Sequence, residues 1–171
     1  MDKENGGYLA AEGGCSMQIS TKFTIAIHLL TAVDFFGETQ QVTSEFLAGS
    51  IGSNPVIIRG IMLKLRAAGL IATKRGPGGI ALARPLADIT FLDVYRAVET
   101  GSRDALFHFH ERPNLQCPVG RNIHRSLDGM LEGIQQRFEA DLARHTVADV
   151  LQNLRACTEE EVSAAHKQQA K

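Results

Sequence analysis

The segment 43–84 constrains the fold more than any other part of the chain. Thr43 can cap a short helix, which a glycine-serine turn then ends. Asn54 and Pro55 form a strong helix start, because asparagine accepts hydrogen bonds from the first turn and proline suits the first helical position. Gly69 stands where a left-handed residue ends a helix. The pattern predicts two helices joined by a tight turn, the second with a buried stripe of Ile57, Ile61, Leu65 and Ala68.

Two short apolar runs follow this pair of helices, at residues 70–73 and 80–82. Between them lies the basic, glycine-rich sequence Lys74-Arg75-Gly76-Pro77-Gly78-Gly79. Two strand-like runs separated by turn residues predict a β-hairpin. We therefore expect a helix-turn-helix followed by a small hairpin with a basic tip, an arrangement that places the second helix of the pair in the DNA major groove.

The flanking segments carry helical signals. A first helix is predicted from Ser20 to about residue 36, and a fourth from Thr90, with Asp93 at the capping-box position. A long helix is predicted from Pro118 to about residue 144, and a final one from Thr146. The long helix carries an apolar stripe at spacings of three and four residues: Ile123, Leu127, Met130 or Leu131, Ile134, Phe138 and Leu142. One small domain would not cover a stripe of this length, so we expect a second copy of the chain to cover it.

The predicted fold class is mainly α with a small β-hairpin wing, that is, a winged helix-turn-helix plus a long C-terminal dimerisation helix. The predicted domains are an N-terminal extension without regular structure (1–16), the winged helix (17–100), a sensor-region loop (101–117), the dimerisation helices (118–157) and a polar tail (158–171).

Charge is distributed unevenly along the chain. Six cations and no acidic residue lie between Phe46 and Ala87, so a net charge of −1 for the whole chain leaves −7 for the remainder. A basic face concentrated in one segment is typical of a phosphate-binding surface, although a solvated charge run is the plain alternative. The chain has neither an apolar run of about 18 residues, as a membrane span needs, nor a secretory signal. We therefore expect a cytoplasmic protein without a membrane partner.

Double-stranded DNA is the predicted partner. Arginine is the side chain that most often reads guanine, through O6 and N7 together, which favours Arg59 in the second helix of the pair. A glycine-rich hairpin tip can approach the DNA backbone closely, and Arg75 beside it can enter a narrow minor groove. The full set of candidate DNA-binding residues is Lys22, Thr43, Ser44, Asn54, Val56, Arg59, Lys64, Lys74, Arg75, Gly76 and Gly78.

Three alternatives stay open at this point. The helices could form a generic three-helix core with surface cations, or a winged helix that binds another protein. The glycine-rich loop could cradle a nucleotide phosphate, although no complete P-loop or dinucleotide fingerprint is present.

Three phrases of the sequence resemble the Rrf2 family of winged-helix regulators: residues 17–22 (MQISTK), LKLRAAGLIATKRGPGG and PLADITFLDVYRAVE. The later LFHFHERPNLQCPVGRNI resembles the YwnA-like branch of that family. The resemblance covers about residues 17–154. It implies a homodimer that binds a pseudo-palindromic operator, usually as a repressor. It also implies that the recognition helix starts near Asn54 and that Arg75 is the minor-groove arginine.

The sequence departs from the cluster-binding members of that family. Those members carry three cysteines before the long helix, where this chain has Cys117 alone, so no iron–sulfur cluster or other cofactor is predicted. The wing turn is one glycine shorter than theirs. Position 59 is arginine where some of them have an acidic residue, so their operator sequence does not transfer to this chain.

Cys117 is the candidate redox residue. It directly precedes the long helix, and the positive end of a helix dipole favours the thiolate. The alternatives are a small capping residue packed at the dimer interface, a metal site with His108, His110 and His124, or a catalytic nucleophile. The histidine spacing matches no standard metal site, and an enzyme would need an oriented base and a pocket. We therefore expect no enzyme. Cys15 and Cys157 are expected to be inert.

Overall fold

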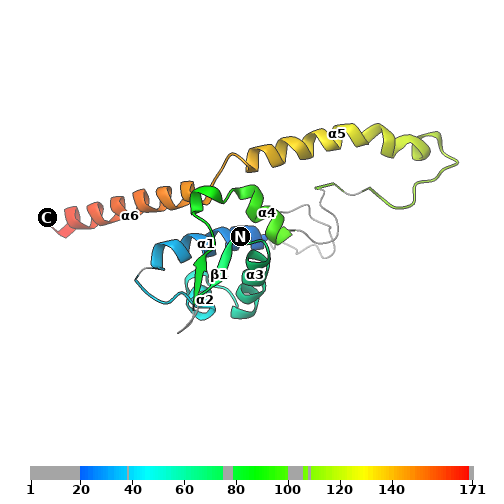
Figure 1. Ribbon diagram of the computed structural model, residues 1–171. Helices are drawn as coiled ribbons and strands as arrows, with labels where there is room; N and C mark the ends of the chain where they lie inside the picture. Colours follow the sequence, from blue (N-terminus) through cyan, green and yellow to red (C-terminus); the bar gives the residue numbers. More distant parts are fainter. Residues whose placement is uncertain (1–19, 38, 75–78, 100–105, 108, 170–171) are drawn as a thin grey trace, which may run out of the picture.

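The computed structural model describes residues 20–37, 39–74, 79–99, 106–107 and 109–169 (Figure 1). The winged-helix part consists, in chain order, of α1 (Thr21–Phe36), α2 (Ser44–Ile51), α3 (Pro55–Ala67), β1 (Ile71–Thr73), β2 (Ile80–Leu82), the short 3-10 helix η1 (Leu86–Asp88) and α4 (Phe91–Glu99). Two longer helices follow, α5 (Pro118–Leu142) and α6 (Val147–Gln169). The mainly helical fold class with a small hairpin is confirmed.

The predicted helix starts are confirmed by their capping contacts. The Thr43 hydroxyl accepts a hydrogen bond from the amide of Phe46 at 3.2 Å, and the Asn54 side chain accepts one from Val56 at 2.8 Å. Gly69, with φ of +69°, follows the last residues of α3 in the left-handed conformation that glycine adopts without strain. These local signals therefore set where α2 and α3 begin and where α3 ends.

Helix α1 lies at the centre of the core and packs against α2, α3, α4 and the first turns of α6. Phe23, Ile27, Leu30 and Val33, which recur at helical spacing in the sequence, are buried, and so is Leu29 on another side of the helix. Because neighbours surround α1 on several sides, burial extends round it and the helix is not simply amphipathic. This central packing holds the helix-turn-helix and the hairpin together.

One predicted stripe is wrong in detail. In α3 the buried residues are Ile58, Ile61 and Leu65, whereas Ile57 is 48% exposed and Ala68 is exposed. Spacings of three and four residues fit the observed set as well as the predicted one. The choice between Ile57 and Ile58 depends on where α1 and α2 pack, which local spacing does not determine.

The hairpin is antiparallel, with Ala72 opposite Ala81 at its centre. The amide of Ile80 donates to the carbonyl oxygen of Val42 at 3.2 Å, which joins the second strand to the chain entering α2. Gly79 has φ of +121°, and a β-carbon there would meet the Val42 carbonyl at 3.3 Å. The base of the wing is therefore fixed to the helix-turn-helix.

In the described part of the chain no single helix is long and apolar enough to cross a membrane. Helices α2 and α3 reach that length and apolar content only together, and a bend of 113° separates them.

Helices α5 and α6 extend away from the winged-helix part in opposite directions (Figure 1). Helix α5 contains no buried residue along its 25 positions. Helix α6 is different at its start, because Val147 and Leu151 are buried in the core. It continues to Gln169, so most of the segment expected to be a polar tail is helical.

We predict that Asp93→Asn destabilises the fold by about 1 kcal/mol. Asp93 accepts hydrogen bonds from the Thr90 amide and hydroxyl, each at 2.9 Å, and pairs with Arg84 at 3.0 Å. Burial alone raises the pKa of Asp93, but the bonds from Thr90 and the charge of Arg84 outweigh it, so the net pKa is lowered. Urea unfolding of both proteins gives the difference.

The difference between wild type and Asp93→Asn should also depend on pH. A lowered folded pKa adds stability above the ordinary aspartate pKa of about 3.9, and that stability is lost as the pH falls through the folded value. The two proteins should thus differ at pH 7 and converge in acid. Glu159→Gln, which removes an exposed carboxylate from α6, serves as the control. Equal stability of wild type and Asp93→Asn at pH 7 would contradict the prediction.

Candidate nucleic-acid interface

The exposed side of α3 is the surface that the helix-turn-helix arrangement presents. At about 100° per residue, Val56, Arg59 and Leu63 lie on one side of the helix. Val56 is 69% exposed and Leu63 is 63% exposed, so two aliphatic side chains of α3 lie outside the core. Aliphatic groups on a recognition helix can contact thymine methyl groups, whereas arginine reads guanine. The side of α3 that faces away from the core thus combines apolar groups with an arginine donor.

Arg59 is held by α2. Its Nε donates to the Ser44 hydroxyl at 3.3 Å, and its guanidinium forms an ion pair with Glu45. Ser44 in turn donates to Glu45 at 2.9 Å. The side-chain hydrogen bond from Arg59, followed by the one from Ser44, lowers the pKa of Glu45. Glu45 is therefore charged at neutral pH.

The cation-rich segment 46–87 contains no acidic residue, but the fold brings acidic side chains from outside it to some of its cations. Arg59 pairs with Glu45, and Arg84 pairs with Asp93, both acids from just outside the segment. Lys64 donates to the carbonyl oxygen of Val98 at 2.7 Å, at the C-terminal end of α4. The expectation of six uncompensated cations is therefore wrong, because the fold brings acids from outside the segment to two of them.

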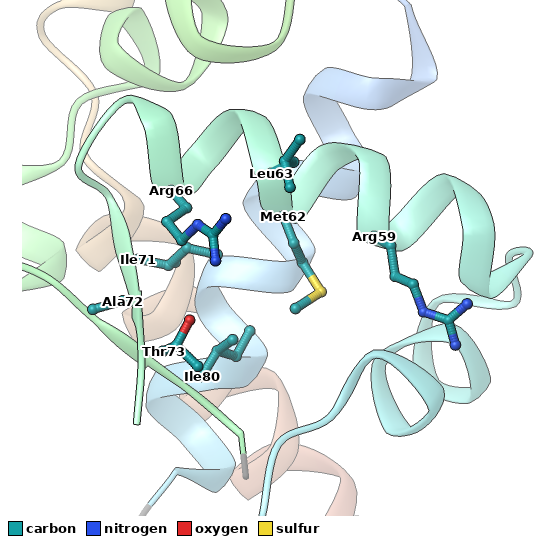
Figure 2. Close-up of a pocket in the computed structure, with 8 residues that line it drawn as sticks. All are labelled: Arg59, Met62, Leu63, Arg66, Ile71, Ala72, Thr73 and Ile80. Carbon is teal, nitrogen blue, oxygen red and sulfur yellow. The ribbon is translucent and has the colours of Figure 1, made fainter. Parts of the chain in front are cut away.

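A groove of about 260 Å³ lies between α3 and the hairpin (Figure 2). Arg59 and Arg66 of α3 stand along one side of it, and Ile71 and Thr73 of β1 line the other. Arg66 was not among the predicted site residues. It follows Arg59 by seven positions, and this spacing of two helical turns places both on one side of α3. The spacing was visible in the sequence and could have identified Arg66.

The other predicted residues take different places. Thr43 and Asn54 use side-chain oxygens to cap α2 and α3. The Lys74 ammonium donates to the carbonyl oxygen of Gly37 at 3.2 Å, at the base of the wing. Lys22 is exposed in the first turn of α1. The wing-tip residues Arg75, Gly76 and Gly78 lie outside the described residues.

Cys117 is exposed and occupies the capping position at the start of α5, as the sequence predicted. The backbone amides of Gly120, and then of Val119, lower the pKa of its thiol. The Cys117 amide donates to the carbonyl oxygen of Asn114 at 3.1 Å. A β-carbon at position 120 would stand 2.3 Å from that same oxygen, so the turn requires glycine there. The backbone turn that carries Cys117 is thus fixed at the start of α5.

The predicted histidine group is partly assembled. The rings of His110 and His124 lie 5.0 Å apart, and that of Phe109 lies 4.6 Å from His124. His108 lies outside the described residues. Among those that are described, no group of three or more His, Cys, Asp or Glu side chains is placed to hold a metal ion.

The fold, with α3 exposed beside a hairpin, defines a winged helix-turn-helix transcription regulator. The chain belongs to the Rrf2 family, because residues 19–153 match the family described as "Iron-dependent Transcriptional regulator". YwnA of Bacillus subtilis (strain 168), assigned as an HTH-type transcriptional regulator, is 35% identical over 136 residues, which cover 80% of this chain and 98% of YwnA. The resemblance inferred from the sequence phrases is confirmed, and the family consists of regulators rather than enzymes.

Solved structures agree with the family assignment. A structure assigned to a DNA binding protein is 32% identical with a TM-score of 0.61, covering 76% of this chain and 98% of the other. The structure of T. potens IscR is 25% identical with a TM-score of 0.58, covering 80% of this chain and 88% of IscR.

The iron in the family's description finds no matching ligands here. Iron–sulfur clusters are held by about four ligands, mostly cysteine thiolates. The chain has three cysteines. The two that the structure describes, Cys117 and Cys157, lie on α5 and α6, which extend in opposite directions. Within the described residues, these two thiols therefore do not fit such a cluster.

We predict that Cys117 is alkylated at a lower pH in the folded protein than in the unfolded chain. Only the thiolate reacts quickly, and the amides at the start of α5 favour it. Mass spectrometry of iodoacetamide-treated protein across a pH series gives the midpoint for Cys117. The same residue in 6 M guanidinium is the reference and should titrate near the ordinary thiol value of about 8.5. A folded midpoint at or above that reference would contradict the prediction.

Proposed function

We propose that the chain is a homodimeric, cytoplasmic DNA-binding regulator that represses transcription by binding a pseudo-palindromic operator. The observation that carries this proposal is the exposed side of α3, where Arg59 and Arg66 flank a groove beside the hairpin. In this proposal α3 enters the major groove, and the wing, with Arg75, contacts the minor groove and the backbone. Family membership and the DNA-binding relative support the same assignment.

The long helix supports the dimer. Helix α5 is about 38 Å long at 1.5 Å per residue. Its apolar stripe is only partly covered, because Phe138 packs on Tyr95 whereas Met130 is 68% and Ile134 40% exposed and none of the 25 residues is buried. A second copy that packs its own α5 against this stripe would bury it in an isologous interface. A two-fold axis relates the two copies in such an interface, so the dimer would present two recognition helices to two half-sites.

Cys117 supports a redox response. The exposed thiol with its lowered pKa lies at the far end of α5 from the winged-helix core. We infer that a peroxide oxidises the Cys117 thiolate to a sulfenic acid, which condenses with a second thiol, from solution or from the second subunit, to form a disulfide and release water. This disulfide changes the dimer and weakens DNA binding. Oxidised wild type should then lose operator affinity while oxidised Cys117→Ser keeps it. Equal losses in both proteins would remove the redox part of the proposal and leave DNA binding in place.

The exposed aliphatic residues of α3 favour one other function. Val56 and Leu63 could instead contact a protein. Arg59 pairs with Glu45 and Arg84 pairs with Asp93, so these two cations do not by themselves call for a phosphate partner. A duplex titration decides between the two functions, because protein recognition requires no counterion release from DNA.

We predict that Arg59→Ala and Arg75→Ala each weaken binding to a selected operator by about 1–3 kcal/mol. Arg59→Ala would remove a contact with a base, and Arg75→Ala would remove a contact in the minor groove. Fluorescence anisotropy with duplexes from 50 to 200 mM salt measures both affinity and salt dependence. Glu159→Gln, on the exposed part of α6, should bind as wild type does. Unchanged operator affinity in both folded variants would mean that DNA is not read by this surface.

We predict that Leu127→Asp combined with Ile134→Asp yields a monomer that no longer binds the operator. Both positions belong to the α5 stripe, and charged groups there would be buried without partners in a dimer. Sedimentation at micromolar concentration gives the mass of each protein. Asp128→Asn, on the same helix but outside the stripe, is the control and should remain dimeric. A monomeric wild type would disprove this dimer.

A further inference from the structure

The contact between Arg59 and Glu45 has no evident structural purpose. The two side chains are 57% and 63% exposed, and exposed ion pairs contribute about 0–1 kcal/mol to stability. Yet the contact is elaborate for a surface pair, because Ser44 accepts from Arg59 and donates to Glu45 at the same time. It also lies on the side of α3 that the proposed function presents to DNA.

Glu45 changes what Arg59 can do near a duplex. An uncommitted arginine at this place would bind any phosphate, which raises affinity for every sequence. With Glu45 attached, a phosphate oxygen must approach a carboxylate of the same charge. A guanine edge carries no net charge, so it can accept from the donors of Arg59 that remain, and Glu45 can accept from a cytosine N4 amino group.

Arg66 provides the comparison within the same helix. It lies two helical turns from Arg59 on the same side of α3 and at the same groove. Within the described residues it has no acidic partner. The two arginines thus differ in one respect that matters for DNA: one is bound to a carboxylate and the other is not.

We propose that Glu45 is a specificity-determining residue, which holds Arg59 for a base edge and prevents its use as a phosphate contact, while Arg66 supplies affinity for any sequence. The proposal rests on the proposed DNA-binding function. In this proposal Glu45 acts by positioning Arg59. The sequence preference of the recognition helix α3 then depends on a residue of the neighbouring helix α2.

The test compares selected and random DNA. Duplexes are first selected from a random library with the wild-type protein, and affinities for the selected and a scrambled duplex are then measured across a salt series. Glu45→Gln should bind scrambled DNA more tightly, and the slope of log K against log[salt] should steepen by about 1, as one more phosphate contact requires. The ratio of selected to scrambled affinity should fall by about 5- to 150-fold.

Three further variants separate the mechanism from a general change in charge. Glu159→Gln removes the same charge from α6 and should leave the ratio unchanged. Arg66→Gln should weaken both duplexes alike and keep the ratio. In an Arg59→Gln background, Glu45→Gln should no longer alter the ratio, since Glu45 acts through Arg59. Circular dichroism confirms that each variant is folded.

The outcomes are distinct. If Glu45→Gln leaves the ratio unchanged, or changes it equally in the Arg59→Gln background, Glu45 does not set specificity, although the protein still binds DNA. If the wild-type protein binds no duplex, the proposed function fails, and the inference fails with it. A repeat library selection with Glu45→Gln should also lose its base preference at the position that Arg59→Gln affects.

Discussion

Two backbone hydrogen bonds hold the molecule's separate parts together. The amide of Phe91 donates to the carbonyl oxygen of His145, and the amide of Val147 donates to that of Ile89, each at 2.9 Å. They join the start of α4 to the start of α6, with Thr90 opposite Thr146. The whole of α5 lies between these two points in sequence, so the chain leaves the core and returns to the same place. Burial of Val147 completes the join. The join therefore ties both ends of the loop that contains α5 to the core.

Helix α3 has one side buried in the core and one side exposed to solvent. Ile58, Ile61 and Leu65 are buried and fix the helix to α1 and its neighbours. The opposite side keeps arginines in water together with aliphatic side chains, whose apolar surface adds no stability while it stays exposed. Apolar surface left exposed in this way is typical of a binding site, and the carboxylate from α2 beside Arg59 fits that interpretation. Stability and recognition are thereby assigned to different residues of one short helix.

Local signals predicted the elements well, because capping and turn chemistry act within a few residues. Thr43, Asn54 and Thr90 begin their helices where their side chains indicate. The site was harder to predict. Arg59 and Glu45 are 14 positions apart, and the acid-free segment that holds the cations begins at Phe46, one residue after Glu45. An ion pair between two helices depends on their packing, which the linear sequence does not display. Arg66, by contrast, was visible from its spacing.

The attachment of α5 makes its length as important as its composition. Phe138 packs edge-to-face on Tyr95 of α4, with ring centroids 5.4 Å apart, and so fixes the rotation of α5 at its base. One residue inserted between Cys117 and Phe138 would turn the distant thiol by about 100° round the helix axis and move it by about 1.5 Å. It would also turn one half of the apolar stripe away from the other. Residues gained or lost in the loops at either end of α5 would preserve this phase, whereas a change of length within the helix would rotate Cys117 relative to the winged-helix part.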